Sequence, residues 1–432
     1  MSRRATDGVE QARMFVNASQ VVTCAGAGRA RRGAEMADAV IRTGVGVVIH
    51  EGRIAAVAEP DVLRDVFPDA REIDCGQRVL MPGLVDSHTH AIFGRARFEE
   101  QEMRAAGLDY MEIARRGGGI HSSVRDLRSR PEWELYALAK ERLTRLASFG
   151  TTTVEVKSGY GLTLADELKT LRVIARLARE LPMRIVPTFL GAHEIPLEHR
   201  ESTATRAAYV ELLIHEMIPA VEADKLARFA DVFCETGVYT VDESRAILTA
   251  ARDAGMGIKL HADELTASGG AELAASLGAT SADHLAAISD AGIAALAAGS
   301  TVATLLPGTM LFLGKTKQAP ARRLIEARVP VALATDFNPG TSPTQNLPLV
   351  MTLGMSQLRL TASETVIAAT VNGAAALGLA DRVGQIAPGF SADLAIFDVR
   401  DVREVPYWYG DNRCVATFAR GKACHTSDLG LT

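Results

Sequence analysis

The chain has 432 residues, of which 47% are hydrophobic and 23% are charged. This length accommodates one large α/β domain with a smaller appendage, and the composition argues against global disorder. A formal net charge of -5 offers no basic surface to a polyanion, which disfavours nucleic acid and favours a small-molecule partner. No stretch reaches the roughly 20 apolar residues that a membrane-spanning helix needs, so we expect no membrane partner either.

The cysteines and the N-terminal segment indicate the compartment. Five cysteines are scattered through the chain without a CxxC pair, which argues against a disulfide framework and against a structural zinc cluster. The first 15 residues carry basic side chains but lack the apolar segment and the small-residue cleavage site of a secretory signal. We therefore expect a cytoplasmic protein.

Both ends of the chain have a β-like pattern. From about 16 to 59, short runs rich in Val and Ile are separated by turn residues such as those at 50–52. The pattern returns near the C-terminus in residues 393–399 and 414–424. We predict that residues 1–80 and 380–432 together form a small discontinuous β-sandwich domain.

The middle of the chain, residues 81–379, alternates short β-branched runs with stretches rich in Ala, Leu, Arg and Glu. This alternation is typical of repeated βα units. Helical stretches between the runs include 133–149, 165–181 and 241–255. Eight such units predict a (β/α)₈ barrel of the TIM type. The eight candidate strands are residues 80–88, 151–158, 184–193, 231–237, 257–264, 281–285, 301–308 and 331–338.

The first candidate strand ends in a pair of histidines, His88 and His90. Side chains two positions apart on a strand point to the same face, so both imidazoles can reach one metal ion. Such a pair is often structural when it stands alone. Its position at the end of a barrel strand, where this fold builds its active sites, favours a metal site.

Three more strand ends carry possible ligands. His261, His284 and Asp336 end the fifth, sixth and eighth candidate strands. Each alone could be a satisfied polar group, but their common location at one end of the βα units favours a joint metal site. Imidazoles with a carboxylate suit one zinc or iron ion, which can lower the pKa of a bound water to about 7. Hydrolysis is therefore the expected chemistry.

The segments PGLVDSHTH, KLHADE, SADHL and ATDFNPG resemble the landmarks of the amidohydrolase superfamily. The resemblance implies a (β/α)₈ barrel with a small β domain from both chain ends. Dinuclear members carry a carboxylated lysine on the fourth strand, where this chain has Cys234 and Glu235. A mononuclear site with one Zn²⁺ or Fe³⁺ per subunit, and a homodimer, are thus implied. The implied ligands are His88, His90, His261 and Asp336.

Further segments resemble the imidazolonepropionase family over nearly the whole chain: FGRARFEE, RRGGGIHSSV, VEVKSGYGL, TFLGAHEIP and TDFNPGTSP. The glycine-rich segment at 117–119 lacks the GK[ST] ending of a P-loop, and the resemblance implies an active-site loop instead. The resemblance also implies a role for several residues. Arg97 would hold the substrate carboxylate, Tyr160 and His193 would contact the ring and its substituents, Asn338, Gly340 and Thr341 would hold substrate or product, and Glu264 would face a ring nitrogen.

Elementary chemistry is compatible with these roles. The guanidinium of Arg97 offers a carboxylate a bidentate fork, although an arginine in an RAR run is by itself more often at the surface. Glu264 is typical of a helix start, but near a metal it can protonate a departing nitrogen. His284, if it is not a ligand, can hydrogen-bond the attacking water or the oxyanion, and Asp336 can share the proton work.

The implied reaction is the opening of the ring of 4-imidazolone-5-propanoate to N-formimidoyl-L-glutamate, in the degradation of histidine to glutamate. Two alternatives accompany it. A mononuclear deaminase or another cyclic-amide hydrolase would use the same barrel and metal. A non-catalytic scaffold on this fold is the other alternative, which the complete ligand set disfavours because a scaffold does not need ligands.

Overall fold

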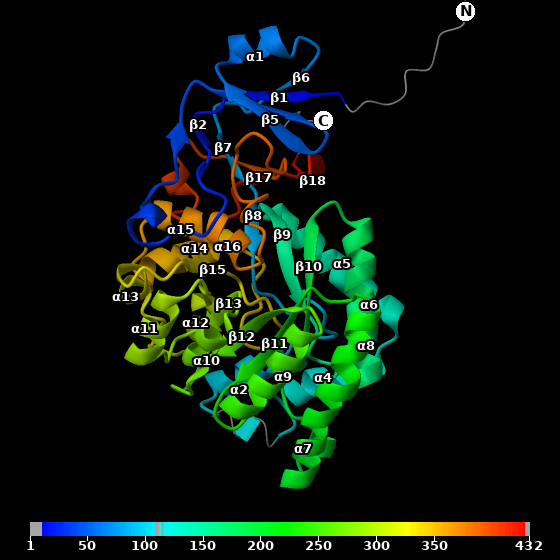
Figure 1. The fold of residues 1–432 in the computed structure, drawn as a ribbon. Coiled ribbons are helices and arrows are strands. Elements are labelled where there is room, and N and C mark those ends of the chain that lie inside the picture. The colour runs from blue at the N-terminus through cyan, green and yellow to red at the C-terminus, as the bar shows by residue number, and fades with distance from the viewer. Residues whose placement is uncertain (1–10, 109–111, 114–115, 428–432) are drawn as a thin grey trace, which may run out of the picture.

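The computed structural model describes residues 11–108, 112–113 and 116–427. A barrel of strands and helices forms one end of the molecule, and smaller sheets built from both ends of the chain form the other (Figure 1). Among the described residues, none of the helices is long and apolar enough to cross a membrane.

Eight parallel strands form the barrel, each hydrogen-bonded to the next in chain order. They are β8 (Leu84–Asp86), β9 (Thr151–Lys157), β10 (Arg184–Ala192), β11 (Phe229–Cys234), β12 (Gly257–Ala262), β13 (Ser281–His284), β14 (Val302–Leu305) and β15 (Val331–Leu333). The first and last strands meet just beyond their ends, where Thr89 and Phe337 form a parallel bridge. The N–H of Asp336 donates to the carbonyl of His88 over 3.0 Å, and the N–H of His90 donates to that of Phe337 over 2.8 Å. The predicted (β/α)₈ barrel is confirmed.

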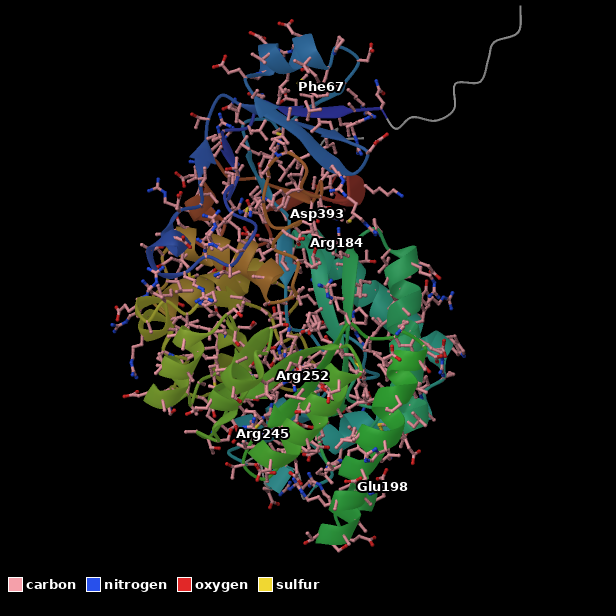
Figure 2. All side chains as sticks on the ribbon, in the orientation of Figure 1. Phe67, Arg184, Glu198, Arg245, Arg252 and Asp393 are labelled. Carbon is pink, nitrogen blue, oxygen red and sulfur yellow. The ribbon has the colours of Figure 1, made fainter. Side chains whose placement is uncertain are left out.

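Helices cover the outside of the barrel and pack through amphipathic faces, with charged side chains on their exposed sides (Figure 2). In α6 (Leu164–Glu180), Leu171, Ile174 and Leu177 are buried at helical spacing, and the Thr163 side chain caps the start of the helix by accepting from the Asp166 N–H over 3.1 Å. The predicted helical stretches correspond to α5 (Glu132–Ser148), α6 and α9 (Val241–Asp253). The other helical elements of this region are α2 (Phe98–Ala105), α4 (Ile120–Ser129), η2 (Leu197–His199), α7 (Thr203–Leu212), the π-helical η3 (Leu213–Met217), α8 (Ile218–Ala223), α10 (Gly270–Leu277), α11 (Asp290–Ala298), α12 (Pro307–Phe312), α13 (Ala321–Glu326), α14 (Leu347–Ser356), α15 (Ala362–Ala368) and α16 (Val371–Ala375).

Two sheets form the small domain and bury one apolar core between them. One sheet has the order β5-β4-β1-β6 and the other β18-β17-β16-β7-β2-β3, so strands from both chain ends share the second sheet. The rings of Phe15 and Phe418 pack edge to face, with centroids 5.3 Å apart. The predicted sandwich is thus confirmed. Its elements are β1 (Arg13–Val16), β2 (Gln20–Val22), η1 (Gly33–Ala37), β3 (Ile41–Arg42), β4 (Gly46–His50), β5 (Arg53–Ala58), α1 (Pro60–Val66), β6 (Arg71–Asp74), β7 (Val79–Pro82), β16 (Leu394–Phe397), η4 (Val402–Glu404), β17 (Cys414–Ala419) and β18 (Lys422–Thr426).

The first candidate strand, residues 80–88, is in fact two strands. Its first part belongs to β7, which pairs antiparallel with β16 in the small domain, and its second part is barrel strand β8. Gly83 separates them at a point where a Cβ would overlap the side chain of Thr152. The proposed division into 1–80 with 380–432 and 81–379 stays a prediction.

Candidate metal centre and active site

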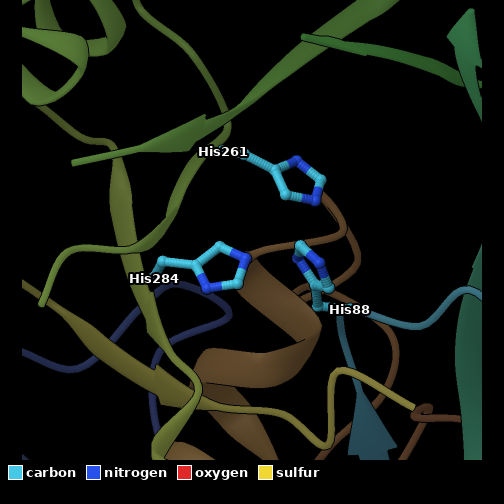
Figure 3. Close-up of side chains that lie close together, drawn as sticks. All are labelled: His88, His261 and His284. Atoms are coloured by element: carbon cyan, nitrogen blue, oxygen red, sulfur yellow. The ribbon is translucent and has the colours of Figure 1, made fainter. Parts of the chain in front are cut away.

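The predicted ligands lie together at the C-terminal ends of the barrel strands. His88 and His90 follow β8, His261 lies in β12, His284 ends β13 and Asp336 follows β15. All of them are buried. The rings of His88, His261 and His284 face one another from separate strands (Figure 3). The βα repeat therefore gathers side chains that are distant in sequence into one site.

The donor atoms of this site lie close to one another. Nε2 of His90 is 3.2 Å from Nε2 of His88 and 3.4 Å from Nε2 of His261. Oδ1 of Asp336 is 3.5 Å from Nε2 of both His88 and His90. The donor atoms of His88, His261 and His284 also lie within 4.8 Å of one another, so His284 borders the same space.

These separations fit a metal ion. In a tetrahedral zinc site with ligands at about 2.0–2.1 Å, neighbouring donor atoms are about 3.3 Å apart. Four separations match that edge length: those of His90 from His88, His261 and Asp336, and that of His88 from Asp336, which are 3.2–3.5 Å. Three imidazoles and one carboxylate also form a donor set that suits zinc or iron, and a water would be the fifth ligand. The residues present therefore fit the predicted mononuclear centre.

Burial keeps the imidazoles of His88, His90 and His284 neutral, as metal ligation requires. Desolvation, reinforced by the positive charge of Lys157, holds the pKa of His88 well below its usual range. Burial likewise lowers the pKa of His90 and of His284. Their ring nitrogens are available to a cation without the loss of a proton near neutral pH.

Asp336 is held by a neighbouring hydroxyl. Thr309 Oγ1 donates to Oδ2 of Asp336 over 2.6 Å, which leaves Oδ1 facing the histidines. In the absence of a cation, burial raises the pKa of Asp336 to about 7, against the lowering effect of the Thr309 hydrogen bond. A bound cation would favour the anionic form of this carboxyl and so reverse the shift.

Two of these residues have left-handed backbones. The φ angle is 79° at His284 and 52° at Asp336. Non-glycine residues adopt this conformation rarely and at a cost of about 1–3 kcal/mol, and such strain concentrates at functional sites. The strained backbone turns both side chains into the site at the points where their strands end.

Tyr160 and His193 form one wall next to the ligands. The ring of His193 stacks on that of His90 with centroids 4.9 Å apart, and Tyr160 lies 5.3 Å from His193 and 6.0 Å from His90, centroid to centroid. Nδ1 of His193 lies 3.0 Å from the carbonyl of Gly159, which can only accept, so Nδ1 carries the proton. Burial lowers the pKa of His193 to about 3.

Arg97 lies at the start of α2 and is largely buried, with 9% of its side chain exposed. Its backbone N–H donates to the carbonyl of Pro339 over 2.9 Å. Nε lies 3.5 Å from Oε1 of Glu100, which also accepts the N–H of Gly119 over 2.7 Å. Arg97 is therefore not a surface arginine, and Glu100 joins it to the glycine-rich loop at 117–119.

The loop after β15 is organised by Asn338. Its Oδ1 accepts the N–H of Gly340 over 2.9 Å and that of Thr341 over 2.7 Å, while Nδ2 donates to the carbonyl of Asp336 over 2.7 Å. Nδ2 also donates to Thr341 Oγ1 over 2.8 Å. The structure thus brings the predicted residues of this loop beside the metal site and uses the Asn338 amide to shape the loop.

Glu264 and His284 meet at the edge of the site. Oε2 of Glu264 lies 3.6 Å from Nε2 of His284, and 11% of the Glu264 side chain is exposed. Burial, with the negative charges of Asp336 and Glu235 added, raises the pKa of Glu264 to about 8. Such a carboxyl holds its proton near neutral pH.

The end of the fourth strand has no lysine, as the sequence indicated. Cys234 is buried, and Glu235 accepts the N–H groups of Thr236 and Leu265, each over 2.8 Å. These hydrogen bonds hold the Glu235 carboxylate between the loops that follow β11 and β12.

Sequence reasoning missed a group of charged residues beneath the ligands. Asp283 lies 2.7 Å from Nδ1 of His88, and Asp231 lies 2.9 Å from Nδ1 of His261. Lys157, Lys259 and Glu155 surround these two carboxylates. The sequence did contain a signal for this group, namely charged residues at alternate positions within strands that were expected to be buried.

Comparison with known proteins agrees with this geometry. A family model described as "Amidohydrolase family" matches residues 79–424. An imidazolonepropionase of Symbiobacterium thermophilum is 49% identical over 413 residues, which cover 95% of this chain and 96% of that protein. One of Geobacillus kaustophilus is 47% identical over 415 residues, covering 95% of this chain and 97% of that protein. The chain belongs to the imidazolonepropionase family of amidohydrolases.

Membership of the imidazolonepropionase family fixes the class of chemistry. The chain is a hydrolase that acts on a C–N bond in a cyclic amide, and its family is one that uses a metal. This assignment removes the non-catalytic scaffold from the alternatives.

Solved structures with low sequence identity share the fold. Guanine deaminase of E. coli has a TM-score of 0.72 at 16% identity, covering 97% of this chain and 100% of that one. An adenosine deaminase of Xanthomonas campestris, solved with bound zinc, has a TM-score of 0.70 at 20% identity and covers 96% of this chain and 92% of that one. At these identities the likeness concerns the fold alone.

Proposed function

We propose that this chain hydrolyses 4-imidazolone-5-propanoate to N-formimidoyl-L-glutamate, a step in the degradation of histidine to glutamate. The observation that carries the proposal is the close grouping of donor atoms of His88, His90, His261 and Asp336, with the guanidinium of Arg97 against Gly340 in the loop that follows Asp336. The four metal-binding side chains suit hydrolysis, and the guanidinium suits a substrate with a carboxylate tail.

One Zn²⁺ or Fe³⁺ per subunit would be held by His88, His90, His261 and Asp336. When bound, such an ion supplies a water of lowered pKa and polarises the carbonyl group that the water attacks. The 3.2–3.5 Å separations of the His90 donor atom from those of His88, His261 and Asp336 support this assignment of ligands.

The propionate carboxylate of the substrate would be bound by Arg97. A guanidinium can donate two parallel hydrogen bonds to one carboxylate in a fixed geometry. Because Arg97 is mostly buried, water competes little for these hydrogen bonds. Tyr160 and His193 would contact the ring from one side. Asn338, Gly340 and Thr341 would form the other boundary, with the Asn338 amide holding the loop in place.

Three side chains would orient the attacking water and protonate the departing nitrogen. Asp336 and His284 would orient the attacking water, because both border the space enclosed by the histidines. Glu264 would give its proton to the departing ring nitrogen, as expected of a buried carboxyl that stays protonated near neutral pH. Its contact with His284 offers a path by which that proton is replaced.

The assembly and the compartment remain predictions from the sequence: a homodimer in the cytoplasm. The five cysteines are all free in the structure, which suits a reducing compartment. Size-exclusion chromatography with light scattering would test the homodimer.

The decisive experiment is an assay of the purified, metal-loaded protein with imidazolone propionate. We expect loss of the ring's ultraviolet absorbance together with formation of N-formimidoyl-glutamate. A His261→Ala variant serves as the control without a complete metal site. No loss of absorbance from mildly acidic to mildly alkaline pH would contradict the proposal, and release of ammonia from an aromatic base would favour the deaminase instead.

A further inference from the structure

Five charged side chains lie inside the barrel directly beneath the candidate metal centre. They are Glu155 and Lys157 on β9, Asp231 on β11, Lys259 on β12 and Asp283 on β13, and none has any exposed side-chain surface. Isolated charges are very costly to bury, so the two lysines and three carboxylates must compensate one another.

Lys157 is central to this charged cluster. Its Nζ lies 2.7 Å from Oδ2 of Asp231, 2.8 Å from Oε2 of Glu155 and 3.8 Å from Oδ2 of Asp283. Lys259 lies on the other side, 3.0 Å from Oε1 of Glu155 and 3.6 Å from Oδ2 of Asp283. Only Lys157 contacts all three carboxylates.

Two of the carboxylates continue directly to metal-ligating histidines. Oδ2 of Asp283 lies 2.7 Å from Nδ1 of His88, and Oδ2 of Asp231 lies 2.9 Å from Nδ1 of His261. The same two oxygens are the ones that face Lys157. A carboxylate at Nδ1 fixes the proton on that nitrogen, leaves the lone pair of Nε2 for a metal and makes the imidazole a better ligand.

The cluster is not a second metal site. His88, Glu155 and Asp283 have donor atoms within 4.8 Å of one another, as a metal site would. The ammonium groups of Lys157 and Lys259, however, lie within 4 Å of both carboxylates. The positive charge that these carboxylates need is therefore supplied by the chain itself.

We propose that Lys157 is a positioning residue of the metal centre, the shared counter-ion through which Asp231 and Asp283 hold His261 and His88 with Nε2 toward the ion. The inference rests on the metal ligands proposed above. It predicts that one buried lysine, which touches no ligand itself, sets the affinity of the site through two of its ligands at once.

The test separates metal affinity from stability. In Lys157→Met, we expect the Kd for Co²⁺, measured by competition with a chelator, to rise on the order of 10–100-fold, as for other substitutions behind metal-bound histidines. The visible absorption of bound Co²⁺ should change in the same variant, because the two imidazoles are no longer held. The unfolding midpoint of the metal-free protein is measured in parallel.

A charge-balanced variant excludes a merely structural role. Lys157→Met combined with Glu155→Gln removes one positive and one negative charge, so the net charge of the cluster stays as it was. We expect its stability to recover toward that of the wild type while Co²⁺ affinity stays low, and we expect Glu155→Gln alone to bind Co²⁺ normally. Wild-type affinity and an unchanged spectrum in the double variant would overturn the inference.

The remaining outcomes are also decisive. If neither lysine variant folds, Asp231→Asn tests the carboxylate step on which the inference depends, since Asp231 contacts both Lys157 and Nδ1 of His261; normal Co²⁺ affinity there would overturn the inference. If the wild-type chain binds neither Co²⁺ nor Zn²⁺, the proposed metal site fails and the inference fails with it. Normal binding by the wild type with no effect of the variants leaves the metal site intact and rejects only the role of Lys157.

Discussion

The guanidinium of Arg97 occupies the space that a side chain at position 340 would fill. A Cβ on Gly340 would overlap Nη2 and the guanidinium carbon of Arg97. The two segments are also joined through the backbone, since Arg97 N–H donates to Pro339, and Arg104 donates to the carbonyl of Gly340 over 3.2 Å. The loop after the last barrel strand thus determines where the proposed carboxylate-binding group lies.

The first prediction concerns Gly340→Ala. The added methyl group must displace Arg97, and a displacement of about 1 Å can reduce kcat/KM on the order of 10²-fold. We expect a large rise in KM with metal content unchanged, measured by steady-state kinetics and elemental analysis. Gly299→Ala is the matched control, because a Cβ there meets only carbonyl oxygens at 3.9 Å or beyond. Equal kinetics for the two variants would show that Arg97 does not hold the substrate.

The second prediction concerns Arg97 itself. Lysine keeps the positive charge but loses the fork that donates two hydrogen bonds to one carboxylate. Because a hydrogen bond to a charged group contributes about 1.5–3 kcal/mol, Arg97→Lys should raise KM roughly 10- to 100-fold, and Arg97→Met should raise it further. Unchanged turnover in both variants would instead favour a substrate without a carboxylate tail.

The third prediction separates proton transfer from metal binding. Glu264→Gln keeps the shape of the side chain but cannot give a proton to the ring nitrogen, so kcat should fall about 10²- to 10⁴-fold. The metal content should stay at the wild-type value, because Glu264 is not one of the proposed ligands. A variant with nearly full kcat would assign the proton step to His284 or Asp336.

The fourth prediction concerns removal of the metal. Dialysis against a chelator should abolish activity, and stoichiometric Zn²⁺ or Fe³⁺ should restore it. Because an ion that binds only the folded state stabilises it, the unfolding temperature should fall on removal and rise again on addition. His261→Ala should show neither recovery. Full activity of the metal-free protein would rule out the proposed chemistry.

The sequence predicted the arrangement of the barrel better than the details of its interior. The strands are short runs rich in β-branched residues between helical stretches, and the ends of parallel strands must lie on one side, so the gathering of His88, His261 and Asp336 at one end of the barrel followed from counting strands. The run at 80–88 was taken as one strand because both parts are apolar. Only pairing with β16 on one side and with β9 on the other reveals the division at Gly83.

The charged cluster could not be assigned from the sequence for a different reason. Alternation places Glu155 and Lys157 on one face of β9, but which carboxylate meets which imidazole depends on the register between strands. Lys157 reaches Asp231 on a strand that is not its neighbour in the sheet, so the contact crosses the barrel interior. Contacts of that kind depend on the closed shape of the barrel, which no local pattern encodes.

The bridge between Thr89 and Phe337 is the seam at which the curved sheet meets itself, and it is short. His88 and His90 lie on one side of this seam and Asp336 on the other. An ion bound by all three would link the segment that follows the first barrel strand to the segment that follows the last one. The ion that supplies the hydrolytic chemistry would then also help to hold the barrel closed.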